Sequence, residues 1–329
     1  MRPWTNQDPR PRCLTRRRRS FYPKPGWLNL GLLAVEGFLW LSDQLNWFAF
    51  NHHKGWTALI AVAAVGVTML LLALWFAASL LFRWRFQFSI RSLLAAVVVV
   101  AIPCSWLATE MEEAKEQWKA ADAIEDLDGT VKWDEPAASR WLRNLLGDYY
   151  FSSVVKVDFF SAPADDAAMA HVEKLSRLED LDVRGTRVTD AGLKYLKKLN
   201  QLRVLGLNVT RVTDAGMEHL KELRHLEWLR LDDTHVTDAG LKYLAGLSQL
   251  RLLGLNRTLV GDAGLEHIKA LAKLDTLDLG ETRVTDAGLQ HVTGLKQLKS
   301  LELSGTRVTT AGVKTLHRAL PECDIQPSW

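Results

Sequence analysis

The sequence predicts an α/β repeat solenoid, with short parallel strands on a concave face and short helices on a convex face, preceded by an all-α transmembrane region. Two observations carry this prediction. An octapeptide recurs every 24 residues in the C-terminal part, and long uncharged apolar stretches occupy the N-terminal part. The octapeptide is TRVTDAGL at residue 186, followed by TRVTDAGM at 210, THVTDAGL at 234, TLVGDAGL at 258, TRVTDAGL at 282 and TRVTTAGV at 306.

Residues 1–26 form a basic tail in which four consecutive arginines, 16–19, precede the first apolar stretch. Such a run can bind nucleic acid or lipid, or it can fix the orientation of the membrane helix that follows. Because apolar sequence begins at Trp27, we interpret the run as a topogenic signal on the cytoplasmic side. We therefore expect the lipid bilayer as a partner and no nucleic acid.

Residues 27–109 are predicted to form a membrane region of three helices, at 28–50, 56–82 and 92–108. The second and third stretches contain no charged residue, and the second exceeds the roughly 20 residues that cross a hydrocarbon core. The first contains Glu36 and Asp43, which lie seven residues apart and therefore on nearly the same helix face. These carboxyl groups form either an intramembrane proton or ion site, with the repeats as a regulatory domain, or a contact between helices.

The basic residues predict the orientation of this region. Arg83, Arg85 and Arg91 lie between the second and third stretches, whereas the loop between the first and second holds only Lys54. By the positive-inside rule the N-terminus is cytoplasmic, and after three crossings the repeats are extracytoplasmic, facing the periplasm from the inner membrane. If residues 28–50 do not cross, the repeats are cytoplasmic and an adaptor role becomes the alternative.

Residues 110–150 are expected to form a juxtamembrane helix and an N-terminal cap, to which residues 130–134 and a helix at 138–146 contribute. Residues 151–329 then form about seven 24-residue repeats. Each repeat contains L-x-x-L-x-L, whose alternating leucines predict a short strand with one face in the core. A period of roughly 20–29 residues with this pattern is typical of a leucine-rich-repeat solenoid.

The octapeptide is predicted to be the corner between strand and helix. In its first copy, Val188 enters the core, Thr189 caps the helix and Asp190 places negative charge at the positive helix end. The first threonine of each copy, beginning with Thr186, is expected to form a ladder of hydroxyl groups that bonds the backbone between coils. The small Gly192 is expected to let neighbouring helices approach.

Function is expected to lie on the concave face, where outward residues vary while the core repeats. No catalytic motif, cofactor site or metal site is found, so we expect a protein-binding scaffold rather than an enzyme. A column of histidines and tyrosines that includes His219 is explained by the period as an exposed helix face. The predicted partner-binding residues are Trp228, Arg230, Asp232, Asp233, Asn208, Asn256, Arg257, Asp182, Asp278 and Glu302.

Three N-terminal stretches carry a resemblance to a known family: WFAFNHHKGWTALIAVAAVGV, LFRWRFQFSIRSLL and VAIPCSWLATEMEEAKEQ. They resemble the anchor and juxtamembrane helix of planctomycete-type bacterial leucine-rich-repeat membrane proteins. The VTDAGL corner is also similar to repeats of F-box adaptors, although no F-box precedes it here. The resemblance implies a membrane-anchored repeat protein of the bacterial envelope and names no ligand.

Overall fold

A computed structural model of the chain describes residues 66, 90–134, 143–144 and 148–327. The chain divides into two compact units, residues 1–51 with 60–105, and residues 52–59 with 106–329. Apart from residue 66, the predicted spans 28–50 and 56–82, with Glu36 and Asp43, lie outside the described residues. The third predicted span lies within helix α3, Ile90–Glu125. Within the described ranges, no helix is both long and apolar enough to cross a bilayer.

The second unit contains a single sheet whose strands follow one another in chain order, β1 to β9. β1 pairs antiparallel with β2, and every later pair is parallel. The strands are β1 Thr130–Trp133, β2 Val154–Asp158, β3 Asp180–Asp182, β4 Val204–Gly206, β5 Trp228–Arg230, β6 Leu252–Gly254, β7 Thr276–Asp278, β8 Ser300–Glu302 and β9 Asp324–Gln326.

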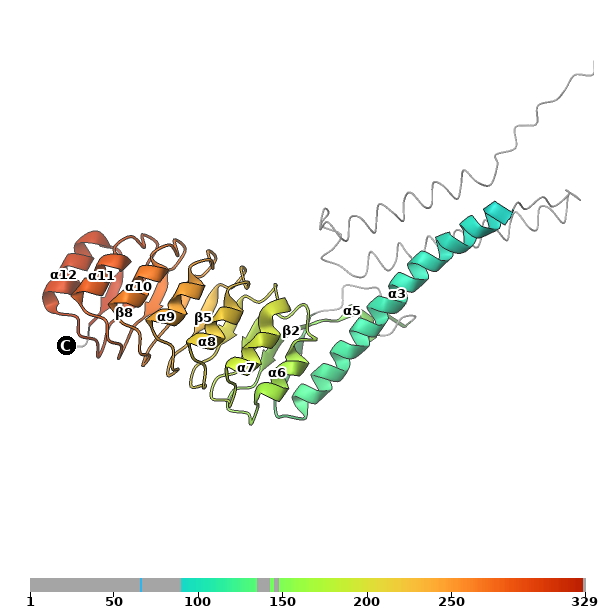
Figure 1. The fold of residues 1–329 in the computed structure, drawn as a ribbon, viewed down its shortest axis with the longest axis horizontal. Helices are drawn as coiled ribbons and strands as arrows, with labels where there is room; N and C mark the ends of the chain where they lie inside the picture. Colours follow the sequence, from blue (N-terminus) through green and yellow to red (C-terminus); the bar gives the residue numbers. More distant parts are fainter. Residues whose placement is uncertain (1–65, 67–89, 135–142, 145–147, 328–329) are drawn as a thin grey trace, which may run out of the picture. The chain divides into compact units, whose positions relative to one another are not determined.

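Short helices form a second layer beside the sheet, one in each coil, and lie in a row along the solenoid (Figure 1). They are α6 Asp166–Val172, α7 Asp190–Leu193, α8 Asp214–Met217, α9 Asp238–Leu241, α10 Asp262–Ile268, α11 Asp286–Val292 and α12 Thr310–Ala319, with α5 Asp148–Phe151 ahead of β2. Three of them continue as 3-10 turns, η2 Lys194–Lys198, η3 Glu218–Leu220 and η4 Lys242–Leu244. The repeat solenoid predicted from the 24-residue period is therefore the fold.

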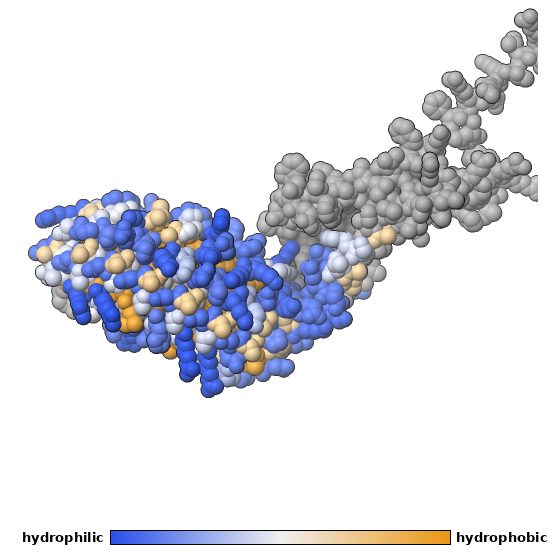
Figure 2. Space-filling view, in the orientation of Figure 1, coloured by the Kyte–Doolittle hydropathy of each residue, from blue (hydrophilic) through white to orange (hydrophobic). Residues whose placement is uncertain are grey.

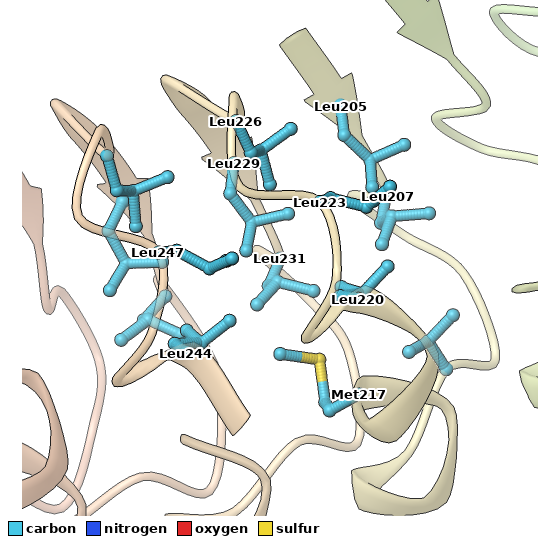
Figure 3. Packing of buried hydrophobic residues seen from close by; sticks show 14 of the residues in the cluster. Leu205, Leu207, Met217, Leu220, Leu223, Leu226, Leu229, Leu231, Leu244 and Leu247 are labelled. Carbon is cyan, nitrogen blue, oxygen red and sulfur yellow. The ribbon is translucent and has the colours of Figure 1, made fainter. Parts of the chain in front are cut away.

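Leucines fill the space between the two layers. The central residues of successive strands pair in register, as Leu205 does with Leu229, and both side chains are almost fully buried. Figure 3 shows strand leucines such as Leu207 and Leu231 and the helix-side residues Met217 and Leu220 pointing into the space between the layers. No coil can bury its apolar face alone, so the core exists only where coils stack.

The two ends of the solenoid also follow the predicted pattern. Val157 and Phe159 are buried in the first coil, and Ala164 is buried where later coils have Val. Residues 130–134 were expected to help cap the first edge, and β1 forms there and pairs with β2. At the other end Ile325 pairs with Leu301, so β9 is a last half-coil.

The octapeptide joins successive coils through its aspartate. Oδ1 of Asp190 accepts a hydrogen bond from the backbone N–H of Thr213 at 2.8 Å, and Oδ2 accepts one from the Thr213 hydroxyl at 2.6 Å. The same hydroxyl oxygen accepts from the N–H of Ala215 at 3.3 Å, which is the predicted helix cap. The pattern repeats from Asp166 to Asp286, except that Asp238 meets Gly261, which has no hydroxyl.

The predicted ladder of Thr hydroxyls between coils is wrong. Thr186 is buried, but its hydroxyl donates to the carbonyl of Val183 in the same coil, at 2.7 Å. Thr210 does the same to Leu207 at 2.6 Å. A hydroxyl on a short side chain reaches a carbonyl three residues back more easily than one in the next coil. This threonine therefore closes its own turn, and Thr189 and its equivalents link the coils.

A residue in the left-handed conformation follows each strand from β2 to β8, and together these residues form a column. The backbone φ is positive at Ser161, Gly185, Val209, Asp233, Arg257, Glu281 and Gly305. Glycine adopts this conformation without cost, and Asn or Asp with little, whereas a β-branched residue there is an outlier. Val209, at φ 56°, is the β-branched member.

We expect Val209→Asn to raise the free energy of unfolding by about 1 kcal/mol, since the left-handed conformation costs most L-residues about 1–2 kcal/mol. Little burial is lost, because the Val209 side chain is 58 % exposed. Urea unfolding of the two proteins measures the change. Arg257→Asn is the matched control in the same column. It removes no β-branched group and breaks an exposed ion pair with Glu281, so a smaller gain than at Val209 is expected there.

Candidate binding surface

The first and third residues of each parallel strand point away from the core, and we call the surface they form the sheet face. β5 shows the arrangement most clearly, with Trp228 and Arg230 exposed and Leu229 buried between them. Trp228 is 48 % exposed, which is unusual for so large an aromatic side chain. On the side drawn in Figure 2, apolar residues of the described solenoid are scattered singly among hydrophilic ones.

Several predicted binding residues are already engaged within the protein. Asp182 is only 9 % exposed, because both its carboxylate oxygens accept from Nε of Arg184 at 2.8 Å. The pair raises the pKa of Arg184, chiefly through this hydrogen bond. Arg184 also lies over the ring of Phe160, 5.0 Å from its centroid. Asp182 is therefore a structural residue rather than a free contact.

Asn208, Asp232, Asn256 and Asp278 form a polar row across four coils. Nδ2 of Asn208 donates to Oδ2 of Asp232 at 2.6 Å, and Oδ1 of Asp232 accepts from the backbone N–H of Asn256 at 3.0 Å. Nδ2 of Asn256 donates to Oδ1 of Asp278 at 3.4 Å. Burial raises the pKa of the Asp232 carboxyl, although the N–H of Asn256 opposes the effect. The row holds neighbouring coils together at the end of the strands.

The remaining charged candidates also have partners. Arg257 lies between Asp233, at 3.8 Å, and Glu281, at 3.1 Å, in the left-handed column. The Glu302 carboxylate accepts from the backbone N–H of Ser304 at 2.9 Å. At the start of the strands, Arg203 pairs with Glu227 of the next coil at 2.7 Å. Exposed pairs of this kind contribute little to stability, but each charged group in them already has a partner within the protein.

Trp228 and Arg230 are the predicted residues that remain available. In the paired strands Trp228 lies between Val204 and Leu252, and Arg230 lies between Gly206 and Gly254. They border a hollow of about 280 Å³ in the sheet face. Its lining consists of Lys156, Asp180, Leu181, Asp182, Arg184, Val204, Leu205, Gly206, Trp228 and Arg230.

Sequence reasoning did not include Lys156, Asp180, Val204 or Gly206 among the binding residues. The sequence did contain one indication of the hollow. Gly206 occupies an outward strand position beside Trp228 and Arg230 of the next coil. The absence of a side chain at Gly206 lets Asp182 and Arg184 of the preceding coil lie over it, and both line the hollow.

The histidine and tyrosine column lies on the helix side. The predicted exposed face holds for His267, whereas His219 and Tyr243 are partly buried. Burial lowers the pKa of His219, and nearby Lys197 adds to the effect. Within the described part of the chain, no three metal-binding side chains lie close enough together to hold an ion.

A family model described as a leucine-rich repeat matches residues 175–197 and 222–245. The chain carries leucine-rich repeats. The first match ends in the coil of α7, and the second covers the strand β5 that bears Trp228 and Arg230. The leucine-rich repeats thus provide the residues that border the hollow.

Many solved structures are similar to the chain, among them two internalins and a plant receptor. Internalin InlF of Listeria monocytogenes is 19 % identical over 49 % of this chain and 44 % of its own, with a TM-score of 0.43. Internalin C2 of the same bacterium is 20 % identical over 53 % of this chain and 80 % of its own, with a TM-score of 0.42. The plant peptide hormone receptor RGFR1, in complex with RGF2, is 14 % identical over 50 % of this chain and 27 % of its own, with a TM-score of 0.35. The chain thus spans less than half the length of InlF. No curated protein matches the chain.

Proposed function

We propose that this protein is a membrane-anchored leucine-rich-repeat scaffold that presents its sheet face to a protein partner outside the cytoplasm. The observation that carries the proposal is the hollow bordered by Trp228 and Arg230. Half-exposed Trp and unpaired Arg side chains are enriched at the centres of protein interfaces. The surrounding ion pairs and the polar row fix the backbone beneath them, so little ordering is needed on binding.

The anchor is inferred from the sequence. Together with the apolar stretch 28–50, the uncharged stretches 56–82 and 92–108 and the arginines between them favour three crossings with the N-terminus in the cytoplasm. The resemblance of these stretches to planctomycete-type membrane proteins favours the same arrangement. The repeats then lie in the periplasm, and their partner is an envelope protein.

Thiol labelling tests the orientation. Cys323 is buried, and burial raises the pKa of its thiol, so it is a poor target. We therefore compare Cys13 with Ser328→Cys, using a membrane-impermeant maleimide on cells whose outer envelope is permeabilised. We expect labelling at 328 and protection at 13. The reverse pattern, or protection at both, would place the repeats in the cytoplasm and favour the adaptor role.

Site-specific photocrosslinking tests the surface. A photoreactive residue at Leu252, beside Trp228 on the sheet face, should give a discrete protein adduct in cells, and Trp228→Ala should remove that adduct. The matched control is the same group at Gln290, which is exposed on α11 in the helix layer. Identical adducts from both positions, or an adduct unaffected by Trp228→Ala, would contradict a sheet-face scaffold.

A further inference from the structure

Not every charged side chain that lines the hollow has an ion-pair partner. Nζ of Lys156 pairs with Asp180 at 2.8 Å, and Arg184 pairs with Asp182. Arg230 forms no ion pair with any described residue. The acidic side chain closest to it in sequence is Asp232, whose two oxygens are held by Asn208 and by the N–H of Asn256. Arg230 is therefore the guanidinium of the hollow that no described carboxylate contacts directly, although Asp232 lies near enough to interact with it electrostatically.

The surroundings of Arg230 leave its guanidinium accessible. Its neighbours in the paired strands are Gly206 and Gly254, and although Asp182 lies over the first and Asp232 over the second, the Arg230 side chain remains exposed. A guanidinium binds a carboxylate through two parallel hydrogen bonds, and such charge-assisted bonds are among the strongest in proteins. The complementary ligand group at this end of β5 is a carboxylate.

The other end of β5 is complementary to an apolar group of a ligand. Trp228 is half-exposed and has the aliphatic side chains of Val204 and Leu252 on either side. An aliphatic or aromatic side chain placed there would bury the exposed ring face. Trp228 and Arg230 are two residues apart on one strand, so their side chains leave the sheet about 7 Å apart.

This spacing specifies the ligand. In an extended peptide, residues i and i+2 point to the same side and are also about 7 Å apart. We propose that the hollow binds an extended peptide segment in which an apolar side chain and a carboxylate are two residues apart. The inference rests on the proposed function and names the chemistry of its partner. The volume, about 280 Å³, suits a few side chains of a peptide rather than a larger ligand.

Short peptides test the proposal directly. The probe is a heptapeptide with blocked ends, Phe at position three, Asp at position five and Gly or Ser elsewhere, titrated against the purified full chain by fluorescence anisotropy. Three comparison peptides carry Asn for Asp, Ala for Phe, or Asp moved by one position. We expect the probe to bind at least tenfold more tightly than each of them. Equal binding of the Asp and Asn peptides would overturn the proposal.

Two variants locate the contact. Arg230→Gln should abolish the preference for Asp over Asn and leave the preference for Phe over Ala. Arg211→Gln is the matched control, because it removes an equal charge from an exposed side chain outside the hollow. If Arg211→Gln lowered the affinity as much as Arg230→Gln, the effect would be general charge attraction and the proposal would fail. Unchanged thermal midpoints confirm that both variants are folded.

A further peptide distinguishes two sources of the carboxylate. It ends two residues after Phe with a free C-terminus and lacks Asp. Tighter binding than the internal Asp peptide would assign the site to a chain terminus, and weaker binding to an acidic side chain. If no peptide binds while the crosslink at Leu252 persists, the ligand chemistry proposed here is wrong and the scaffold function stands. If both fail, the proposed function fails with it.

Discussion

Asp214→Ala is expected to lower the free energy of unfolding by about 2–4 kcal/mol, because the carboxylate makes two charge-assisted hydrogen bonds to the next coil. Its oxygens accept from the backbone N–H of Thr237 at 2.8 Å and from the Thr237 hydroxyl at 2.6 Å. Removing them leaves a partly buried N–H without a partner. Since neighbouring coils stabilise one another in a solenoid, the loss also weakens the coupling between its two halves. Urea unfolding followed by circular dichroism measures both the midpoint and the cooperativity.

Two further variants control for the position of the bond. Asp286 makes the same two bonds to Thr309, but near the end of the solenoid, where Thr309 is exposed. Asp286→Ala should therefore cost less than Asp214→Ala. In the opposite direction, Gly261→Thr supplies the hydroxyl that Asp238 lacks and should stabilise by about 1 kcal/mol. An unchanged stability for Asp214→Ala would show that the aspartates do not join the coils.

The period made most of the fold predictable. A strict spacing of 24 residues places equivalent residues side by side, so the core leucines, the helix caps and the last half-coil around Ile325 follow from counting. Counting does not say which of two neighbouring threonines reaches across to the next coil. Thr186 and Thr189 have the same hydroxyl, and only the path of the backbone directs one inward and the other toward Asp166.

The candidate site was less predictable for a related reason. The outward positions of the strands were identified, but each polar residue there can bind a partner or a neighbouring coil. Asp182, Asp232 and Asn256 form hydrogen bonds within the protein. Whether such bonds form depends on the exact positions of the side chains, which the sequence does not give. Trp228 and Arg230 remained available because valine, leucine and glycine are their neighbours. The composition of the adjacent coils therefore distinguished the free residues from the engaged ones.

Gly240→Ala is expected to destabilise the protein by about 2–4 kcal/mol, at or above the upper end of typical overpacking costs. A Cβ at this position would lie 2.5 Å from Oδ1 of Asp214 and 3.1 Å from the Val236 side chain. The carboxylate cannot move away without breaking its bonds to Thr237. The glycine was expected to let the neighbouring helix approach, and it does: its closest neighbours include Asp214 and Met217, the first and last residues of α8.

Gly246→Ala is the matched control within the same repeat. A Cβ there meets no atom within 4 Å, so its stability should change by less than about 0.5 kcal/mol. A similar loss for both glycines would point to backbone flexibility rather than to the carboxylate.

The double variant Asp214→Ala with Gly240→Ala identifies the shared cause. Once the carboxylate is absent, the added methyl group no longer meets it, and it partly fills the space that the carboxylate leaves. The double variant should therefore be clearly more stable than the sum of the two single losses predicts, with an interaction energy of about 1–2 kcal/mol. Additive losses would mean that the glycine and the aspartate serve separate purposes. A strong coupling would show that Asp and Gly of the octapeptide, in neighbouring coils, form one contact, which is why the period repeats them together.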